Sequence, residues 1–396
     1  MNTSIAPRKP GDLDQNFGLS GSVVGPENGI VKSIVAGADD KLTFAVQIQN
    51  VNDCEIHRLH SDGSNDTSFG NDGIVTVRFG NDGASVPNRL IQRDGKIWLI
   101  GDQTSGDGGV PAVTRRNANG TPDLVFGTRL LSAPATSSNA FPSDGCLQDD
   151  GKLLVLSARI PDTGTTTKGL LTRLHNDGSV DSGFGKEGQI DIEFGVQNSR
   201  MVNVIVQENG KIVVGGNSFG SNGNKVVLAR FNPDGSSDET FGIDGQMMYG
   251  PEHGLHDLIQ VIAQPDGKLV CAGKTGYSQA FVMRFTADGL TDATFNGGKE
   301  VLTELGSTDC QWRALAIQTD GKIVLAGWNA SLYQAMFCGR LNQNGTWDPS
   351  FASAGWGAIR GIPGTPYCAT TQSQGRIIIA GSRIQGYFSV VAGIQN

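Results

Sequence analysis

An internal repeat constrains the fold of this chain more than any other feature. An Asp-Gly-Lys turn followed by a short apolar run, as in "PDGKLVCAGK" and "TDGKIVLAGW", recurs seven times when looser copies such as "SQGRIIIAGS" are included. From Asp40 to Gly375 the successive steps are 55, 56, 59, 57, 54 and 54 residues. Such a period indicates one supersecondary unit repeated along the chain, so it takes precedence over a domain count based on length.

A second marker alternates with these turns and is clearest in "NPDGSSDETFGIDG", in which a Phe stands three positions after an Asp. Its seven pairs are Asp14/Phe17, Asp66/Phe69, Asp123/Phe126, Asp181/Phe184, Asp238/Phe241, Asp292/Phe295 and Asp348/Phe351. The spacing does not fit the D-x-[DN]-x-[DN]-G register of a calcium loop. Asp and Asn stabilise turns and Gly supplies positive φ, so we interpret these loops as structural, with the Phe packed between neighbouring units.

An arginine precedes six of these loops, and we expect it to form an ion pair or a backbone clamp between neighbouring units. The six are Arg58, Arg115, Arg173, Arg230, Arg284 and Arg340.

Each period contains about four strand-sized apolar segments separated by turns, which predicts a four-stranded antiparallel unit. The chain begins and ends in mid-repeat, so an N-terminal strand can complete the last unit and close a ring. The sequence therefore predicts an all-β, seven-bladed β-propeller with four-stranded antiparallel blades. We expect a single domain over residues 1–396, with the strand at 19–25 completing the blade formed by residues 366–393.

The alternating signatures "xxDGKIvvaG" and "RLnxDGslDxxFGxxG" resemble those of the delta-60 repeat family of bacterial proteins, and the resemblance covers essentially the whole chain. The resemblance implies a β-propeller architecture. It brings no catalytic motif that could be transferred to this sequence.

Composition and charge exclude several classes of function. The formal net charge is −8 and there is no run of lysines or arginines, so we expect neither a nucleic-acid nor an anionic-membrane surface. No apolar run is long enough to span a bilayer, and the N-terminus lacks the apolar core of a secretory signal. We expect a soluble, monomeric protein that is cytoplasmic or exported without a classical signal peptide. The six cysteines show no CxxC pairing, which favours free thiols.

Variable loops that carry aromatic residues are the first candidate site, because loops on a repeated scaffold are typical recognition surfaces. Its ligand-binding candidates are Trp312, Arg313, Trp328, Tyr333 and Tyr277. Aromatic rings flanked by Asn and Gln suit a sugar or a peptide. An alternative stays open, in which Trp312 and Trp328 pack between blades.

The second candidate is a metal site in the segment "PEHGLHD". Its possible ligands are Glu252, His253, His256 and Asp257, although we favour a solvated loop as the explanation of the segment. Two functions follow. We favour a non-catalytic recognition scaffold that binds a carbohydrate or protein partner through one loop face and needs no cofactor. The alternative is a metal-dependent hydrolase or lyase with its site at the central channel.

Overall fold

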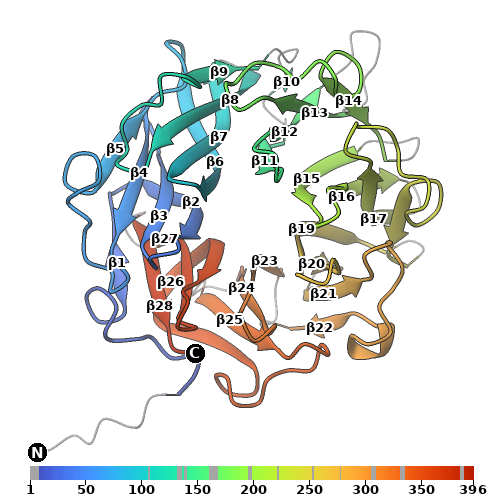
Figure 1. Cartoon of the computed structure of the whole chain (residues 1–396). Helices are drawn as coiled ribbons and strands as arrows, with labels where there is room; N and C mark the ends of the chain where they lie inside the picture. Colours follow the sequence, from blue (N-terminus) through green and yellow to red (C-terminus); the bar gives the residue numbers. More distant parts are fainter. Residues whose placement is uncertain are drawn as a thin grey trace, which may run out of the picture.

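The computed structural model describes residues 9–105, 108–131, 136–137, 141–159, 168–194, 199–220, 223–251, 254–276, 278–304, 309–330, 335–383 and 388–396. In this part of the chain, antiparallel sheets are arranged as a ring around a central opening (Figure 1). The described residues also contain one short 3-10 helix, η1 (Asn296–Gly298).

Five of the sheets stand separately. The first consists of β2 (Gly29–Ala36), β3 (Leu42–Ile48), β4 (Cys54–Leu59) and β5 (Ile74–Val77). The second consists of β6 (Ala84–Arg93), β7 (Lys96–Ser105), β8 (Gly108–Asn117), β9 (Thr128–Leu130) and β10 (Thr136–Ser137). The third consists of β11 (Asp144–Leu147), β12 (Leu153–Arg159), β13 (Lys168–Leu174) and β14 (Gln189–Ile192). The fourth consists of β15 (Ser199–Val206), β16 (Ile212–Gly220), β17 (Gly223–Phe231) and β18 (Gln246–Tyr249). The fifth consists of β19 (His256–Ala263), β20 (Leu269–Thr275), β21 (Gln279–Phe285) and β22 (Val301–Thr303).

The remaining seven strands form one continuous sheet that contains both ends of the chain. In spatial order they are β1 (Ser22–Val24), β28 (Ser389–Ile394), β27 (Ile377–Arg383), β26 (Trp356–Thr371), β25 (Ala335–Leu341), β24 (Ile323–Asn329) and β23 (Cys310–Ile317). The short β1 pairs antiparallel with β28, so that Val23 lies opposite Val391.

The prediction of seven separate four-stranded blades is wrong. Five sheets stand as separate blades, and one of these has a fifth strand because both β9 and β10 pair with β8. The seven-stranded sheet contains the strands of two successive repeats. These repeats are not separated because β26 pairs with β25 through its first half and with β27 through its second half. Pro363 and Gly364 both belong to this 16-residue strand, so no turn divides it.

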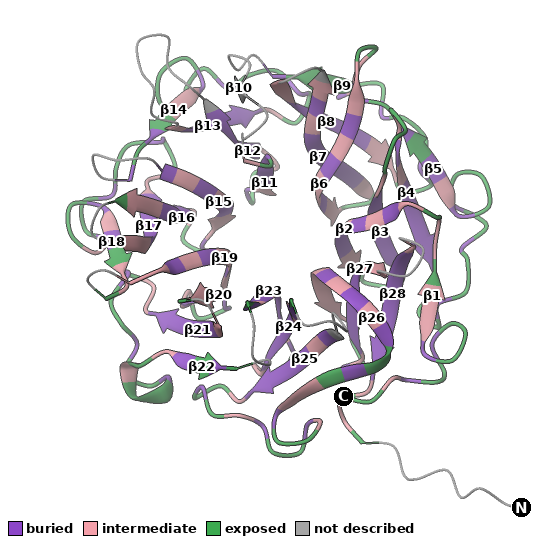
Figure 2. Ribbon diagram, turned by 180° about the vertical axis from the view of Figure 1, so that it is seen from behind, coloured by how far each residue is buried: buried purple, intermediate pink, exposed green. Residues whose placement is uncertain are grey.

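The first strand of each repeat faces the centre of the ring. These inner strands are β2, β6, β11, β15, β19, β23 and the second half of β26. Each packs against the next, and β26 packs against β2, so the inner strands surround the central opening. The buried residues lie mainly within and between the sheets (Figure 2).

The repeated arginine clamps neighbouring repeats together, as predicted. Arg58 Nε donates to Asp66 Oδ2 at 2.7 Å, the guanidinium lies 4.5 Å from the centre of the Phe69 ring, and Nη1 donates to the Ala118 carbonyl in the next repeat. The same Nε-to-carboxylate bond occurs in Arg115/Asp123, Arg173/Asp181, Arg230/Asp238, Arg284/Asp292 and Arg340/Asp348, at 2.6 to 2.8 Å. The Asp-Gly loops are thus structural elements, and their Phe side chains are fully buried.

Candidate functional site

A β-bulge recurs in six of the seven inner strands and projects one residue from each of the six into the central opening. The register shifts between Val31/Ser33, Pro87/Arg89, Met201/Asn203, Leu258/Gln260, Trp312/Ala314 and Pro366/Cys368. A bulge leaves one residue outside the hydrogen-bonded ladder and bends its strand. The residues left out are Lys32, Asn88, Val202, Ile259, Arg313 and Tyr367, and all six line a central cavity.

A polar side chain at the position after the bulge, or at the corresponding Asp144 of β11, ties four of the inner strands to the next. Leu90 N–H donates to Ser33 Oγ at 3.0 Å, and Val204 N–H donates to Asp144 Oδ2 at 2.9 Å. In the same way, Asn203 Oδ1 accepts from the Val261 amide and Gln260 Oε1 accepts from the Leu315 amide. These side chains satisfy buried backbone amides, so the wall of the cavity is held in place by hydrogen bonds.

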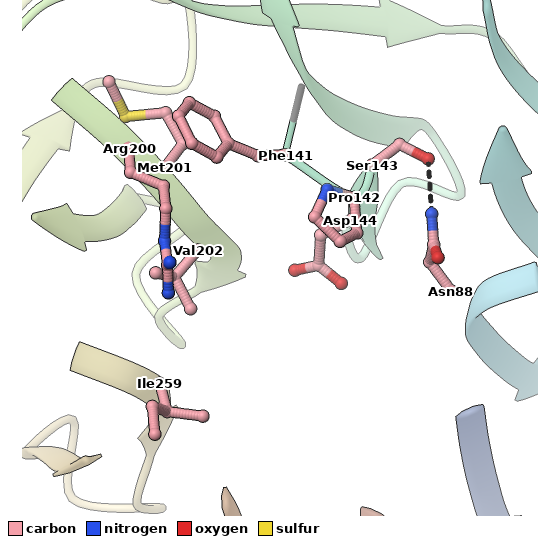
Figure 3. A pocket seen from close by; sticks show the side chains of 9 residues that line it. All are labelled: Asn88, Phe141, Pro142, Ser143, Asp144, Arg200, Met201, Val202 and Ile259. Atoms are coloured by element: carbon pink, nitrogen blue, oxygen red, sulfur yellow. Dashed lines mark hydrogen bonds between the residues drawn. The ribbon is translucent and has the colours of Figure 1, made fainter. Parts of the chain in front are cut away.

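The cavity has two adjoining parts of about 470 Å³ and about 290 Å³, which share Asn88, Pro142, Asp144 and Ile259. In the larger part, the side chains of Arg200 and Asp144 lie apart and extend in the same direction (Figure 3). Asn88 Nδ2 donates to Ser143 Oγ at 3.3 Å and to the half-buried Asp102 at 2.6 Å, which fixes its side chain.

Positive charge dominates the lining. Lys32, Arg89, Arg200 and Arg313 line the cavity, whereas Asp144 is the single carboxylate among the described lining residues. Arg89 Nε lies 3.8 Å from Asp144 Oδ1. Within the described part of the chain, the other three cations have no carboxylate within 4 Å.

Lys32 and Arg313 lie against the same aromatic ring. The guanidinium carbon of Arg313 is 4.7 Å from the centre of the Tyr367 ring, and Lys32 Nζ is 5.4 Å from it. Burial and the nearby Arg313 lower the pKa of Lys32. Burial also lowers the pKa of Arg313; Tyr367 opposes this shift, and the charge of Arg200 adds to it. Both cations are thus held where their charge is costly.

The structure does not bring all the residues of the predicted aromatic site to one surface. Trp312 is fully buried, packs with Leu325 and donates from Nε1 to Thr303 Oγ1 at 3.4 Å, so it has no surface left for a ligand. Trp328 is half-buried and is linked to the cavity through Gln311. With the Gln311 amide oriented so that its oxygen faces these two donors, the oxygen accepts from Trp328 Nε1 at 2.6 Å and from Arg313 at 3.1 Å. Tyr277 and Tyr333 lie outside the described residues.

The predicted metal ligands are not brought together in the part of the chain that the structure describes. His256 is buried, with Nε2 at 2.9 Å from Glu300 Oε2 and Nδ1 at 3.2 Å from Thr275 Oγ1. Asp257 follows it on β19 and accepts from Asn224, so the two side chains leave opposite faces of the strand. Glu252 and His253 are outside the described residues, within which no group of three or more His, Cys, Asp or Glu could hold an ion.

Of the central cations, Arg313 was a candidate from the sequence, whereas Lys32, Arg89 and Arg200 were missed, although the repeat contained a signal for the bulge positions. Val202, Ile259, Arg313 and Tyr367 each lie eight residues before the Gly of the next turn. Aligning the copies on that Gly reveals one position per repeat that varies between apolar, aromatic and cationic residues. A variable position on the inner strand of a ring is a candidate for ligand contact.

Four segments of the chain match a family model described as "Domain of unknown function (DUF5122) beta-propeller": residues 92–126, 148–184, 207–241 and 264–295. Two solved structures of similar fold are Drosophila Semaphorin 2a and a PL25 ulvan lyase. Semaphorin 2a has a TM-score of 0.55 and 7% identity, over 98% of this chain and 76% of that one. The lyase has a TM-score of 0.55 and 10% identity, over 98% and 96%.

A sequence comparison with curated proteins gives no match. None of the helices among the described residues has the length and apolar character needed to cross a bilayer. The four matched segments, together with the ring of sheets, support a β-propeller repeat family for this chain.

Proposed function

We propose that this chain is a non-catalytic recognition module of the delta-60 repeat type, which binds a carbohydrate ligand at the central cavity. The observation that carries the proposal is the cavity itself, which is lined by variable polar, cationic and aromatic side chains from successive inner strands. Its larger part, at about 470 Å³, falls within the roughly 300–1,000 Å³ typical of small-ligand sites.

Rigidity of the wall supports a binding role. The cavity residues stand on bulges whose neighbouring positions are hydrogen-bonded to the adjacent strand, so little ordering is needed when a ligand binds. The ulvan lyase of similar fold is bound to -[GlcA(1-4)Rha3S]-, so a fold of this kind accommodates a saccharide. The likeness is one of fold alone, and the carbohydrate assignment for this chain is the proposal.

The lining side chains favour binding over catalysis. Asp144, the single described carboxylate there, already accepts from the Val204 amide and faces Arg89, which leaves no second carboxylate to form an acid–base pair. Cys368 also lines the cavity, but burial raises the pKa of its thiol, and a protonated thiol is a weak nucleophile.

Trp328 and Gln311 suggest the side from which a ligand enters. They lie where β23 begins and β24 ends, and Gln311 links the indole to Arg313 in the cavity. A ligand that reaches Arg313 from this side would pass Trp328.

A glycan array tests the proposal with two variants, in which a valine is replaced by tryptophan either in the cavity or on the surface. Val202→Trp fills the cavity, whereas Val125→Trp places the same side chain at a surface position that is 67% exposed. We expect the wild type and Val125→Trp to retain a glycan that Val202→Trp loses. Binding by all three proteins alike would place the ligand elsewhere, and no glycan binding by the wild type would overturn the carbohydrate assignment in favour of a protein partner.

Elemental analysis of the same sample tests the enzyme alternative. A stoichiometric metal ion together with turnover of a bound glycan would replace recognition by catalysis, whereas binding without product supports the proposal.

A further inference from the structure

The charge of the cavity is opposite to that of the protein. The chain has a formal net charge of −8, yet four cations and one described carboxylate line the central cavity. The sequence contains more acidic than basic residues, 39 against 31, so the excess of cations in the cavity runs against the average composition of the chain.

The scaffold does not require cations at these positions. Lys32 and Arg313 occupy the bulge, and the same bulge is occupied by Val202 on β15 and by Ile259 on β19. Since an aliphatic residue satisfies the backbone geometry equally well, the two cations must be explained by something other than the fold.

These cations also lack compensation within the protein. In the described part of the chain, neither Lys32 nor Arg313 has a carboxylate within 4 Å, and both lie against the ring of Tyr367. The π-face attracts each cation, but an aromatic ring carries no net charge to neutralise two of them. Burial and repulsion by Arg313 lower the pKa of Lys32, so an anion bound beside Lys32 would stabilise its charged form.

We propose that the cavity binds the oxyanion of an acidic saccharide, with Lys32 and Arg313 as the anion ligands and Tyr367 as the surface beneath them. The proposal rests on the proposed function and specifies its ligand class. A carboxylate or sulfate between the two cations gains charge-assisted hydrogen bonds from the forked guanidinium and from the ammonium group. Arg89 in the same part of the cavity and Arg200 in the adjoining part supply the same sign of potential, and the adjoining part accommodates the neighbouring sugar units.

Isothermal titration calorimetry at low ionic strength tests this inference with defined probes. Sodium glucuronate is compared with glucose, which has the same ring without the carboxylate, and with sodium sulfate, which has the oxyanion without the sugar. The variants are Lys32→Gln and Arg313→Gln. Lys186→Gln, at an exposed position, is the control with the same change of charge.

We expect glucuronate to bind at least ten times more tightly than glucose, and each cavity variant to weaken glucuronate at least tenfold while Lys186→Gln has no effect. Sulfate binding that is equally sensitive to Lys32→Gln would attribute the recognition to the oxyanion and also support the inference. A melting curve identifies any variant that fails to fold. If one cavity variant does not fold, the glucuronate affinity of the other cavity variant tests the inference.

Two results would overturn the inference. Glucose binding as tightly as glucuronate, with no effect of Lys32→Gln, would refute anion recognition while the carbohydrate-binding function stands. Absence of binding by all three probes would also refute it, and the array comparison of Val202→Trp with Val125→Trp would then decide the proposed function separately.

Discussion

Replacing Asp66 by Asn removes one charge from the clamp that joins two neighbouring repeats. Asp66 is 1% exposed, and its Oδ2 accepts from Arg58 Nε at 2.7 Å and lies 3.0 Å from Lys41 Nζ. Its Oδ1 accepts from the Ser68 amide at 3.1 Å. An Asn of the same shape keeps the turn but places a neutral amide against two cations, one of them the buried Arg58.

Breaking a buried ion pair from one side costs about 3–5 kcal/mol, because the partner charge is left uncompensated. The entropy of unfolding is near 2.1 cal/mol/K per residue, which gives roughly 0.8 kcal/mol/K for a chain of 396 residues. The melting temperature of Asp66→Asn should therefore fall by about 4–6 °C if the ring unfolds as one unit.

Differential scanning calorimetry measures this shift, and Asp62→Asn in the same loop is the control. Asp62 is exposed, and its Oδ1 accepts from the Ser64 amide at 2.9 Å, a bond that the Asn oxygen preserves. The control should melt within about 1 °C of the wild type, as surface substitutions usually do. Equal melting temperatures for Asp66→Asn and Asp62→Asn would refute the view that the clamp holds the repeats together.

Three further predictions concern the scaffold. Burial raises the pKa of Asp66, but hydrogen bonds from Ser68 and Lys41 and the charge of Arg58 outweigh it, so the folded-state pKa is lowered. The clamp's contribution to stability is thus complete above the unfolded pKa of about 3.9 and is lost as pH falls through the folded value. Melting curves of the wild type should shift down below about pH 4, whereas Asp66→Asn, already without this charge, should shift less; identical pH profiles would argue against the assignment. Deletion of residues 1–25 removes β1 from the edge of β28 and should cause aggregation, measured by light scattering, or a lower melting temperature, measured by calorimetry. A truncated protein that stays monomeric and melts like the wild type would contradict this prediction. Chelation with EDTA should leave the melting temperature unchanged, because the Asp-Gly loops are held by their own hydrogen bonds; a drop of many degrees that calcium reverses would contradict this.

The sequence predicted the clamp between repeats, because the residues that form it recur along the chain. A clamp such as Arg58 with Asp66 and Phe69 is repeated at a fixed spacing, so local turn chemistry and periodicity were sufficient to assign it. The separation into blades was not predictable in the same way. Gly361, Pro363 and Gly364 favour a turn within β26, but the hydrogen bonds that β26 makes to β25 and then to β27 keep it continuous.

The site was harder to predict because its residues differ from repeat to repeat. Trp312 is aromatic and lies beside a variable loop, as a ligand-binding residue would, but alternation along β23 directs it into the core and its neighbour Arg313 into the cavity. A bulge of one residue decides which of the two faces the centre, and bulges have no reliable sequence signature. Lys32 and Arg313, 281 positions apart in the numbering, meet only when the ring has formed.

The most direct test of the central claim is a crystal structure of the protein soaked in sodium selenate, with diffraction recorded at the selenium absorption edge. Selenate is an oxyanion whose position is revealed by anomalous scattering. The account predicts a selenium peak in the central cavity, with its oxygens at hydrogen-bonding distance, about 2.7–3.2 Å, from Lys32 Nζ and the Arg313 guanidinium, and loss of that peak in Lys32→Gln. Selenate bound at surface sites while the cavity holds none would contradict it.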